Sequence, residues 1–264
     1  MTSRFGLKNS LQMVGQLQTI DFGPAADVTA GPASADVLIV CEHASNAIPE
    51  GLSGLGLDAI VRQSHVAWDP GALGVAKAMA NSLGAGLVAG TISRLVYDCN
   101  RPPDAPSAMP RRSEVFDIPG NLNLSAEARQ ARVDGIYQSF HDALAGRISA
   151  NLGTLRLLLT VHSFTPTYHG QHRPVELGLL HGADDRFARA MLSAAPDQYV
   201  TLLNEPYSAA DGVAHTLDLH GAGNDLLNVM IEIRNDLIVT PQAQADMAAY
   251  LAPWVRRVLD EAQV

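Results

Sequence analysis

Short runs of consecutive apolar residues recur along the chain and are separated by longer mixed segments. A continuous apolar run is typical of a strand that is buried on both faces of a sheet. On this basis the sequence predicts strands over residues 37–41, 86–92, 155–161, 175–180 and 229–233. Residues 94–98 either continue the second of these strands or form a further one.

Between the strands, apolar residues recur at helical spacing, and capping residues mark the helix starts. The clearest helix follows Asp69, an expected N-cap, with Pro70 at the first helical position and Gly84 as a stop. Ser125 and Thr240 are expected N-caps of two longer helices. The predicted helices cover residues 57–63, 70–84, 126–144, 184–194 and 241–262.

Strands and helices alternate, and the strands are apolar on both faces. This pattern predicts an α/β fold, in which one domain has a mixed, mostly parallel sheet with helices on both faces. Residues 1–35 lack a clear period and are expected to form an irregular N-terminal arm, whereas residues 36–264 form the domain. Ligands of such sheets bind beyond the carboxyl ends of the strands, so the residues that follow each strand are the candidates for function.

Composition narrows the possible functions. The chain has 264 residues, of which 47% are hydrophobic and 17% charged, so it can bury a sizeable core and is not a disordered chain. Its formal net charge of −9 argues against a broad nucleic-acid surface, since phosphate binding needs a positive face. Lys8 and Lys77 are the only lysines, and the many arginines suit recognition of carboxylates in a small pocket.

The cysteines and the apolar stretches indicate the compartment. Cys41 and Cys99 are the only cysteines and cannot form a disulfide framework, which favours a reducing environment. Residues 1–23 lack the apolar core of a signal peptide, and no stretch of the sequence is apolar for long enough to span a membrane. We therefore expect a cytoplasmic protein that does not bind a membrane.

Four predicted strand ends are followed by polar residues of the kinds that catalyse reactions. One such residue means little, but four in an open α/β sheet indicate a site, because the ends of parallel strands meet at one edge. The relevant segments are Glu42-His43, Asp98 to Arg101, His162-Ser163 and Glu232 with Arg234.

His43 and His162 are candidate metal ligands, since zinc accepts neutral imidazole and carboxylate groups. Asp69 is the preferred third ligand, although helix capping alone would explain an Asp before Pro70. Glu42 is the alternative, but in an extended chain it would point away from His43 and could simply pair with an arginine.

Several other kinds of chemistry find no support. The helix-borne zinc motif H-E-x-x-H, the dinucleotide and P-loop signatures and the nucleophile elbow G-x-S-x-G are all absent. The two cysteines are expected to be inert core thiols. His141 lies on a predicted helix and is expected to be structural. Loop or surface positions are expected for His169, His172, His181, His215 and His220.

An ordered set of motifs spread over residues 37–237 resembles the N-formylglutamate amidohydrolase family. The most specific is the segment from Ser93 to Arg101, of the form S-R-x-x-x-D-x-N-R. The others are His43 with Ile48-Pro49, His65 with Trp68-Asp69, His162-Ser163, Asn204-Glu205-Pro206-Tyr207, His220-Gly221 and Ile231-Glu232-Ile233-Arg234. That family is similar in turn to zinc carboxypeptidases, and the resemblance implies their phosphorylase/hydrolase-like fold.

The resemblance implies a zinc-dependent amidohydrolase that acts on N-formyl-L-glutamate, a small anionic N-acyl amino acid. Glu232 would move the proton, and Arg101, aided by Asn100, would hold a substrate carboxylate. Arg94 would take a second carboxylate or pair with Asp98. A metal hydrolase of another N-acyl amino acid or a short peptide, and a ligand-binding protein without activity, are the alternatives.

The chain departs from its relatives at two positions. Asn46 stands where carboxypeptidases carry a Glu ligand, which is why the third ligand is sought at Asp69. Glu42 stands where typical formylglutamate enzymes have a proline. The departure at Glu42 indicates a divergent branch of the family, which bears on the substrate more than on the chemistry. The sequence does not determine the oligomeric state.

Overall fold

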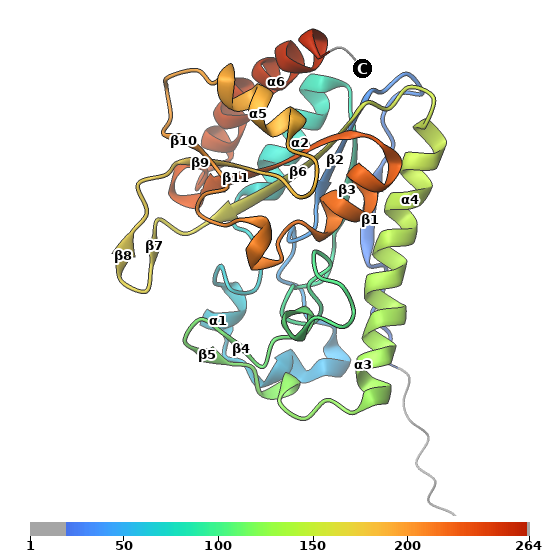
Figure 1. Cartoon of the computed structure of the whole chain (residues 1–264). Helices are drawn as coiled ribbons and strands as arrows, with labels where there is room; N and C mark the ends of the chain where they lie inside the picture. The colour runs from blue at the N-terminus through green and yellow to red at the C-terminus, as the bar shows by residue number, and fades with distance from the viewer. Residues whose placement is uncertain (1–19, 263–264) are drawn as a thin grey trace, which may run out of the picture.

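The computed structural model describes residues 20–262, and seven strands of this part of the chain form one mixed sheet (Figure 1). Four successive strands of the sheet are mutually parallel. One edge strand pairs antiparallel with this group, and the two strands at the other edge, parallel to each other, run antiparallel to it. In spatial order the strands are β1 (Ala26–Thr29), β3 (Gly86–Gly90), β2 (Val37–Cys41), β6 (Leu157–Phe164), β11 (Leu227–Arg234), β9 (Leu177–Leu180) and β10 (Thr201–Leu203).

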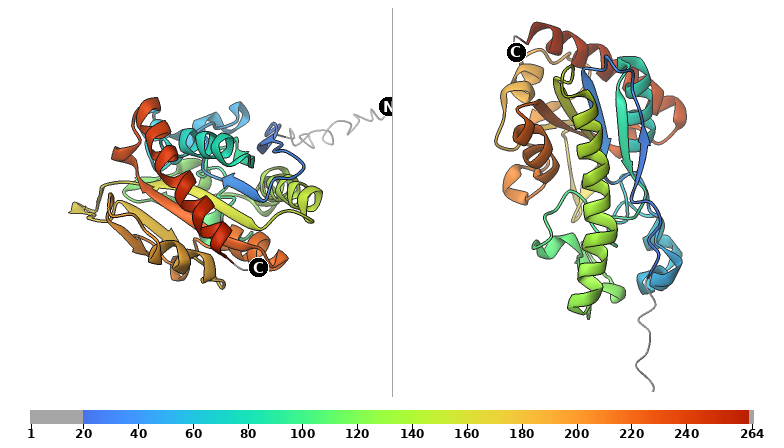
Figure 2. Two further views of the ribbon diagram at one scale, coloured as in Figure 1. Left: turned by 90° about the horizontal axis from the view of Figure 1, so that it is seen from above. Right: turned by 90° about the vertical axis from the view of Figure 1, so that its right-hand side faces the viewer.

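Helices cover both faces of the sheet (Figure 2). One face is packed by α2 (Ala72–Leu83), α5 (Arg186–Ser193) and α6 (Pro241–Glu261). The other face is packed by the π-helical turn η4 (Val133–Gln138) and α4 (Ser139–Asn151), which continue the helix α3 (Ala126–Arg132) as one rod.

Alternation along the buried strands explains these two layers. In β2 every residue is buried, with Ile39 in the core under α2 and α6, and its neighbours Leu38 and Val40 in the core under α4. Successive side chains of a strand point to opposite faces, so a wholly apolar strand supplies both cores at once. The fold class predicted from the sequence is therefore confirmed.

Long connections gather at the carboxyl-terminal edge of the sheet, which is the lower side in Figure 1. They contain the short helix α1 (Ala59–Gln63) and two small hairpins. The hairpin strands are β4 (Arg112–Ser113), β5 (Phe116–Asp117), β7 (Thr167–Tyr168) and β8 (Gln171–His172). Short helical turns complete them: η1 (Glu50–Gly56), η2 (Pro106–Ala108), η3 (Pro119–Asn121) and η8 (Asn235–Leu237). The connection from β10 to β11 carries three more turns: η5 (Ala209–Asp211), η6 (Leu217–Gly221), which packs on β6 and β11, and η7 (Ala222–Asn224).

Three sequence-based expectations need correction. Residues 94–98 form turns rather than a strand, because Ser93 accepts the Leu95 N–H on its side chain and the Val96 N–H on its carbonyl. The expected N-terminal arm is not wholly irregular, since residues 26–29 form the edge strand β1. Residues 1–19 of the arm lie outside the described residues.

The third correction concerns the start of α2. This helix begins at Ala72 with Gly71 as its N-cap, and no side chain caps it. Asp69 supplies only its backbone carbonyl to the Ala72 N–H, so its carboxylate is free for other contacts. The predicted stop at Gly84 is confirmed, because this glycine adopts a left-handed φ of 62° that favours glycine.

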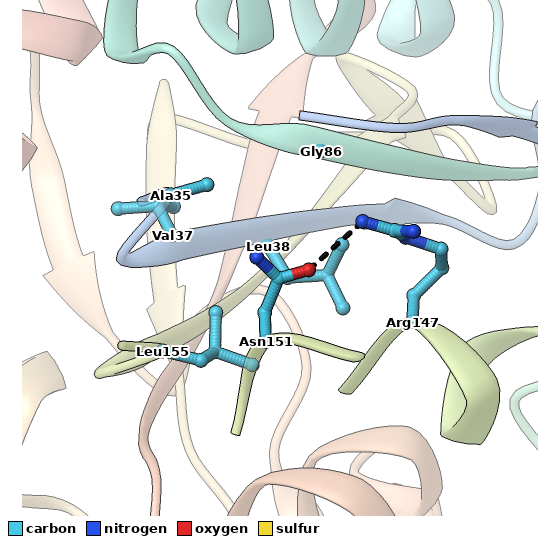
Figure 3. A pocket seen from close by; sticks show the side chains of 7 residues that line it. All are labelled: Ala35, Val37, Leu38, Gly86, Arg147, Asn151 and Leu155. Atoms are coloured by element: carbon cyan, nitrogen blue, oxygen red, sulfur yellow. Dashed lines mark hydrogen bonds between the residues drawn. The ribbon is translucent and has the colours of Figure 1, made fainter. Parts of the chain in front are cut away.

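A small pocket lies at the opposite edge of the sheet, where the parallel strands begin (Figure 3). Arg147 donates a hydrogen bond to Asn151 beside it, at 2.8 Å. None of the residues that the sequence singled out for function lines this pocket. Its lining is Ala35, Val37, Leu38, Gly86, Arg147, Asn151 and Leu155.

Candidate active site

Three neighbouring strands place a row of residues near the carboxyl-terminal edge of the sheet. His162 of β6 pairs with Glu232 of β11, and Glu232 pairs with Gly178 of β9. Paired residues on adjacent strands point to the same face, so His162 and Glu232 carry their side chains side by side. A Cβ at Gly178 would lie 2.0 Å from the carbonyl oxygen of Glu205. The absence of a side chain at Gly178 therefore lets the segment that contains Glu205 pass close to β9.

Asp69 joins the two candidate histidines. Its backbone N–H donates to the carbonyl of His43 at 3.0 Å, which fixes it beside the end of β2. Its Oδ2 atom lies 3.3 Å from His43 Nδ1 and 2.9 Å from His162 Nδ1. The two imidazole rings meet edge to face, with centroids 4.9 Å apart. The side chain of Asp69 therefore serves this cluster and not the helix start.

The opposite nitrogen of each imidazole meets a second carboxylate. His43 Nε2 lies 2.7 Å from Asp98 Oδ1, and His162 Nε2 lies 3.1 Å from Glu42 Oε2. The second contact is an ion-pair distance that lacks hydrogen-bond geometry. A carboxylate at Nε2 favours the tautomer with the proton there, which leaves the Nδ1 lone pair pointing toward Asp69.

His43, Asp69 and His162 form a buried group that could hold a metal ion. One ligand atom from each lies within 4.8 Å of the others. Two imidazoles and a carboxylate are a donor set that catalytic zinc uses, with a further position left for water. The carboxylates behind the imidazoles match the outer contacts that orient metal-bound histidines. The residues present thus fit a divalent metal of the zinc type.

The contacts of Glu42 correct the expectation that it points away from the site. The chain leaves the extended conformation after Cys41, and residues 42 and 43 form a turn, so strand alternation no longer applies. Glu42 is fully buried and pairs with His162 rather than with an arginine. The charges of His162 and His43 outweigh the effect of burial and lower the pKa of Glu42 to about 2.

The other carboxylates and imidazoles of the site also shift one another's pKa values. Burial alone would lower the pKa of His43, but Asp98 and Asp69 outweigh it and raise that pKa. Burial would raise the pKa of Asp98, but His43 and Arg94 hold it well below its usual range. The attraction between opposite charges causes these shifts and stabilises a dense array in which each of these carboxylates faces a cationic or metal-binding group.

Glu232 is the exception among the buried carboxylates. Burial raises its pKa to about 7, with His162 opposing the rise and Asp69 adding to it. Its Oε2 atom is buried and accepts no hydrogen bond from the described part of the chain. A carboxylate with a pKa near neutrality and a free oxygen can both accept and donate a proton under working conditions.

Arg94 and Asn100, both expected to bind substrate, are held by the protein itself. The Arg94 guanidinium lies 2.8 Å from Asp98 Oδ2 and 3.5 Å from Asp69 Oδ1, so it neutralises carboxylates of the site. The Asn100 side chain donates to the carbonyl of Val213 at 2.5 Å and accepts the Thr216 N–H at 3.0 Å. Asn100 thereby ties its loop to the segment before η6.

Arg101 differs from Arg94 because no carboxylate of residues 20–262 lies within ion-pairing distance of it. It is buried, and its Nη1 donates to the carbonyl of Asn100 at 2.8 Å. Its Nε–H makes no hydrogen bond within the described chain. A buried guanidinium with an unused donor is suited to an anionic ligand.

Sequence reasoning missed the roles of Asp98 and of a histidine pair behind the site. Asp98 was visible inside the S-R-x-x-x-D-x-N-R motif, but only the folded chain shows that it contacts His43. His220, expected in a loop or at the surface, is buried and stacks on His141 with ring centroids 5.0 Å apart. No spacing in the sequence links residues 141 and 220.

Comparisons with known proteins identify the family and the fold. The profile of the N-formylglutamate amidohydrolase family matches residues 35–239. A solved structure of a gene product of Agrobacterium tumefaciens is 48% identical, with a TM-score of 0.88, and the match covers 90% of this chain and 96% of that one.

A more distant structure shows the same fold. N-formylglutamate amidohydrolase from Ralstonia eutropha JMP134 is 16% identical, with a TM-score of 0.64 and coverage of 90% of this chain and 98% of that one. No curated protein matches the chain. Because the family profile spans most of the domain, the chain belongs to the N-formylglutamate amidohydrolase family, a family of hydrolases that act on an amide bond.

Proposed function

We propose that this chain hydrolyses N-formyl-L-glutamate to formate and L-glutamate, with zinc held by His43, Asp69 and His162. The observation that carries the proposal is the convergence of both histidine Nδ1 atoms on Asp69 Oδ2, beside Glu232, whose Oε2 accepts no hydrogen bond within residues 20–262. When bound, zinc polarises the scissile carbonyl and lowers the pKa of a water molecule toward ~7.

Glu232 performs the proton transfers. As a carboxylate it accepts a proton from the attacking water, and as a carboxylic acid it returns that proton to the departing amino nitrogen of glutamate. Its pKa of about 7 suits both halves of this cycle near neutral pH. The strand pairing with His162 keeps its carboxylate next to the metal-binding group.

Arg101 holds a carboxylate of the substrate through its planar guanidinium. Asn100 acts one step away, by fixing the loop that carries Arg101 to the segment of residues 213–216. Arg94 keeps Asp69 and Asp98 ionised and neutralised. Of the two roles expected from the sequence, a contact to a second substrate carboxylate and a pair with Asp98, the proposal takes the pair. A net charge of −9 is compatible with an anionic substrate, since local arginines govern capture.

The proposed setting is the cytoplasm. Cys41 and Cys99 are both free and buried, as expected in a reducing compartment. Within residues 20–262, no helix combines the length and apolar character needed to cross a membrane. The proposed partner is a small N-acyl amino acid and not a nucleic acid.

The test combines metal analysis with a substrate panel. We expect about one zinc per chain by elemental analysis, and formate release from N-formyl-L-glutamate faster than hydrolysis of other N-acyl amino acids or short peptides. Arg101→Lys keeps the charge but loses the fork, so KM should rise more than kcat falls. Faster turnover of another compound in the panel would identify that compound as the substrate. If the chain contains no metal and hydrolyses none of the compounds, it is a ligand-binding protein.

A further inference from the structure

Arg173 is an arginine near the site that the proposed reaction leaves without a role. It follows β8, and its guanidinium lies over three aromatic rings, with its carbon 4.5 Å from the ring centre of Tyr168, 5.0 Å from Tyr207 and 5.6 Å from Phe164. Its Nη1 donates to the Tyr207 hydroxyl at 3.1 Å and to the carbonyl of Thr165 at 3.4 Å. These contacts fix the position of the guanidinium plane.

The guanidinium is held but not neutralised. No carboxylate of residues 20–262 lies within ion-pairing distance of it, whereas Arg94 and Arg234 each contact two. Its Nε and Nη2 donate no hydrogen bond to the described chain. Aromatic faces attract the cation without occupying the N–H groups at its edge, so these donors stay available.

The sheet places this guanidinium beside the reacting groups. Phe164 lies two residues after His162 in β6 and therefore on the same face. Tyr207 packs against Leu180 and Met230, which lie two residues from Gly178 and Glu232 on the same strands.

The segment that carries Tyr207 touches the reacting row directly. Its Glu205 carbonyl lies over Gly178, which pairs with Glu232. Burial, followed by the charge of Glu232, raises the pKa of Tyr207, which agrees with this proximity. Arg173 thus lies on the β9 side of the row, whereas Arg101 lies in the loop between β3 and α3.

We infer that Arg173 determines specificity by binding a second carboxylate of the substrate while Arg101 binds the first. The site then selects N-acylated dicarboxylic amino acids over their side-chain amides. This inference rests on the proposed function. It assigns to Arg173 the second-carboxylate contact that the sequence left open for Arg94, whose guanidinium pairs with Asp98 and Asp69.

The test compares two substrates that differ only in the side-chain charge. The wild-type chain should prefer N-formyl-L-glutamate to N-formyl-L-glutamine by about 10- to 100-fold in kcat/KM, the range for a charge-assisted hydrogen bond. Arg173→Met should lose that preference because its kcat/KM falls for N-formyl-L-glutamate and stays unchanged for N-formyl-L-glutamine. Arg173→Lys, which preserves the charge, should retain part of it. Arg257→Met, at an exposed arginine of α6 on the other face, is the matched control.

Equal losses on both substrates in Arg173→Met and Arg173→Lys would overturn the inference and leave Arg173 as a support for the hairpin β7–β8. A separate binding experiment tests the role of Arg173 even if the chain does not hydrolyse N-formyl-L-glutamate. Calorimetry should show that Arg173→Met weakens binding of glutarate by about 10-fold or more and leaves butyrate unchanged. Arg173-dependent glutarate binding without turnover would refute only the reaction, and glutarate binding that ignores Arg173 would refute the inference.

Discussion

At the scale of single residues, the site is defined by which carboxylate meets which imidazole nitrogen. Asp69 faces the Nδ1 atoms of both histidines, whereas Asp98 and Glu42 face the Nε2 atoms. A metal ligand and an orienting carboxylate differ in what their loss does. Removing a ligand removes a bond to the metal, whereas removing an orienting group weakens binding typically by ~10- to 100-fold.

Asp69→Asn and Glu42→Gln should therefore give different results. We expect Asp69→Asn to purify with far less zinc than the wild-type chain, because the metal would keep only two protein ligands. Glu42→Gln should bind zinc about 10- to 100-fold more weakly while still reaching full occupancy at excess metal. Titration against a chelating dye measures both affinities. The reverse pattern would make Glu42 the third ligand.

Glu232→Gln preserves the shape of the side chain but cannot accept a proton. We expect kcat to fall by about 10²- to 10⁴-fold, the usual value of general acid–base help. Zinc content should be unchanged, since the proposed role of Glu232 is that of a base and not of a ligand. Turnover close to that of the wild-type chain would exclude Glu232 from proton transfer, and loss of zinc would make it a ligand.

The raised pKa of Glu232 also affects stability. Its pKa is raised from 4.5 to about 7 in the folded chain, so the folded state binds more protons than the unfolded state between these values. The free energy of unfolding contributed by this group therefore decreases as pH rises through that window. Metal-free Glu232→Gln should gain stability over the metal-free wild-type chain on going from about pH 4.5 to pH 7. Urea unfolding of both proteins measures the difference, and parallel pH curves would contradict it.

At the scale of elements, a buried histidine pair connects α4 and η6 to the loop that carries Arg101. His141 Nε2 donates to the carbonyl of Cys99 at 2.9 Å, so its Nδ1 accepts a hydrogen bond from His220 Nε2 at 2.8 Å. This arrangement requires a neutral His141. Burial, followed by the charge of its partner, lowers the pKa of His141 to about 4.

This pair predicts sensitivity to acid. The pKa of each histidine is lowered from 6.5 to about 4, so the unfolded chain binds more protons than the folded chain between these values. The free energy of unfolding should decrease as pH falls through that window. His220→Gln should reduce this pH dependence, because, of the pair, the unfolded variant can bind a proton only at His141 and no longer at residue 220. Denaturant unfolding at several pH values compares the variant with the wild-type chain, and identical slopes would count against the pair.

At the scale of the whole molecule, the site joins segments that are far apart in the sequence. His43 and Asp69 flank the first long connection, Asp98 follows β3, and His162 ends β6. A metal that binds His43, Asp69 and His162 only in the folded state stabilises the entire domain by mass action.

Removal of metal should therefore lower the melting temperature of the wild-type chain. The decrease should be reversed by added zinc and should grow with zinc concentration, as expected for a ligand of the folded state. Asp69→Asn should show little change on chelation. Scanning calorimetry with and without a chelator measures the effect, and a chelator-insensitive wild-type melt would argue against a metal bridge.

The sequence by itself determined the architecture and pointed to side chains that the fold brings together, among them the group of His43, Asp69 and His162. Apolar runs such as 37–41 and 229–233 identified the buried strands, because a strand between two helical layers must be apolar on both faces. Polar residues at the strand ends identified His43, His162 and Glu232, because parallel strands bring those ends to one edge.

Only the tertiary structure decided which of these side chains contact one another. The contacts of Asp69, Asp98 and Glu42 depend on turns at residues 42–43 and 93–96, where strand alternation does not apply. The engagement of Arg94 by Asp98 and the aromatic setting of Arg173 depend on loops from different parts of the chain. Local patterns determine elements because their periods are local, whereas the partner of a charged side chain is set by long-range packing that no spacing records.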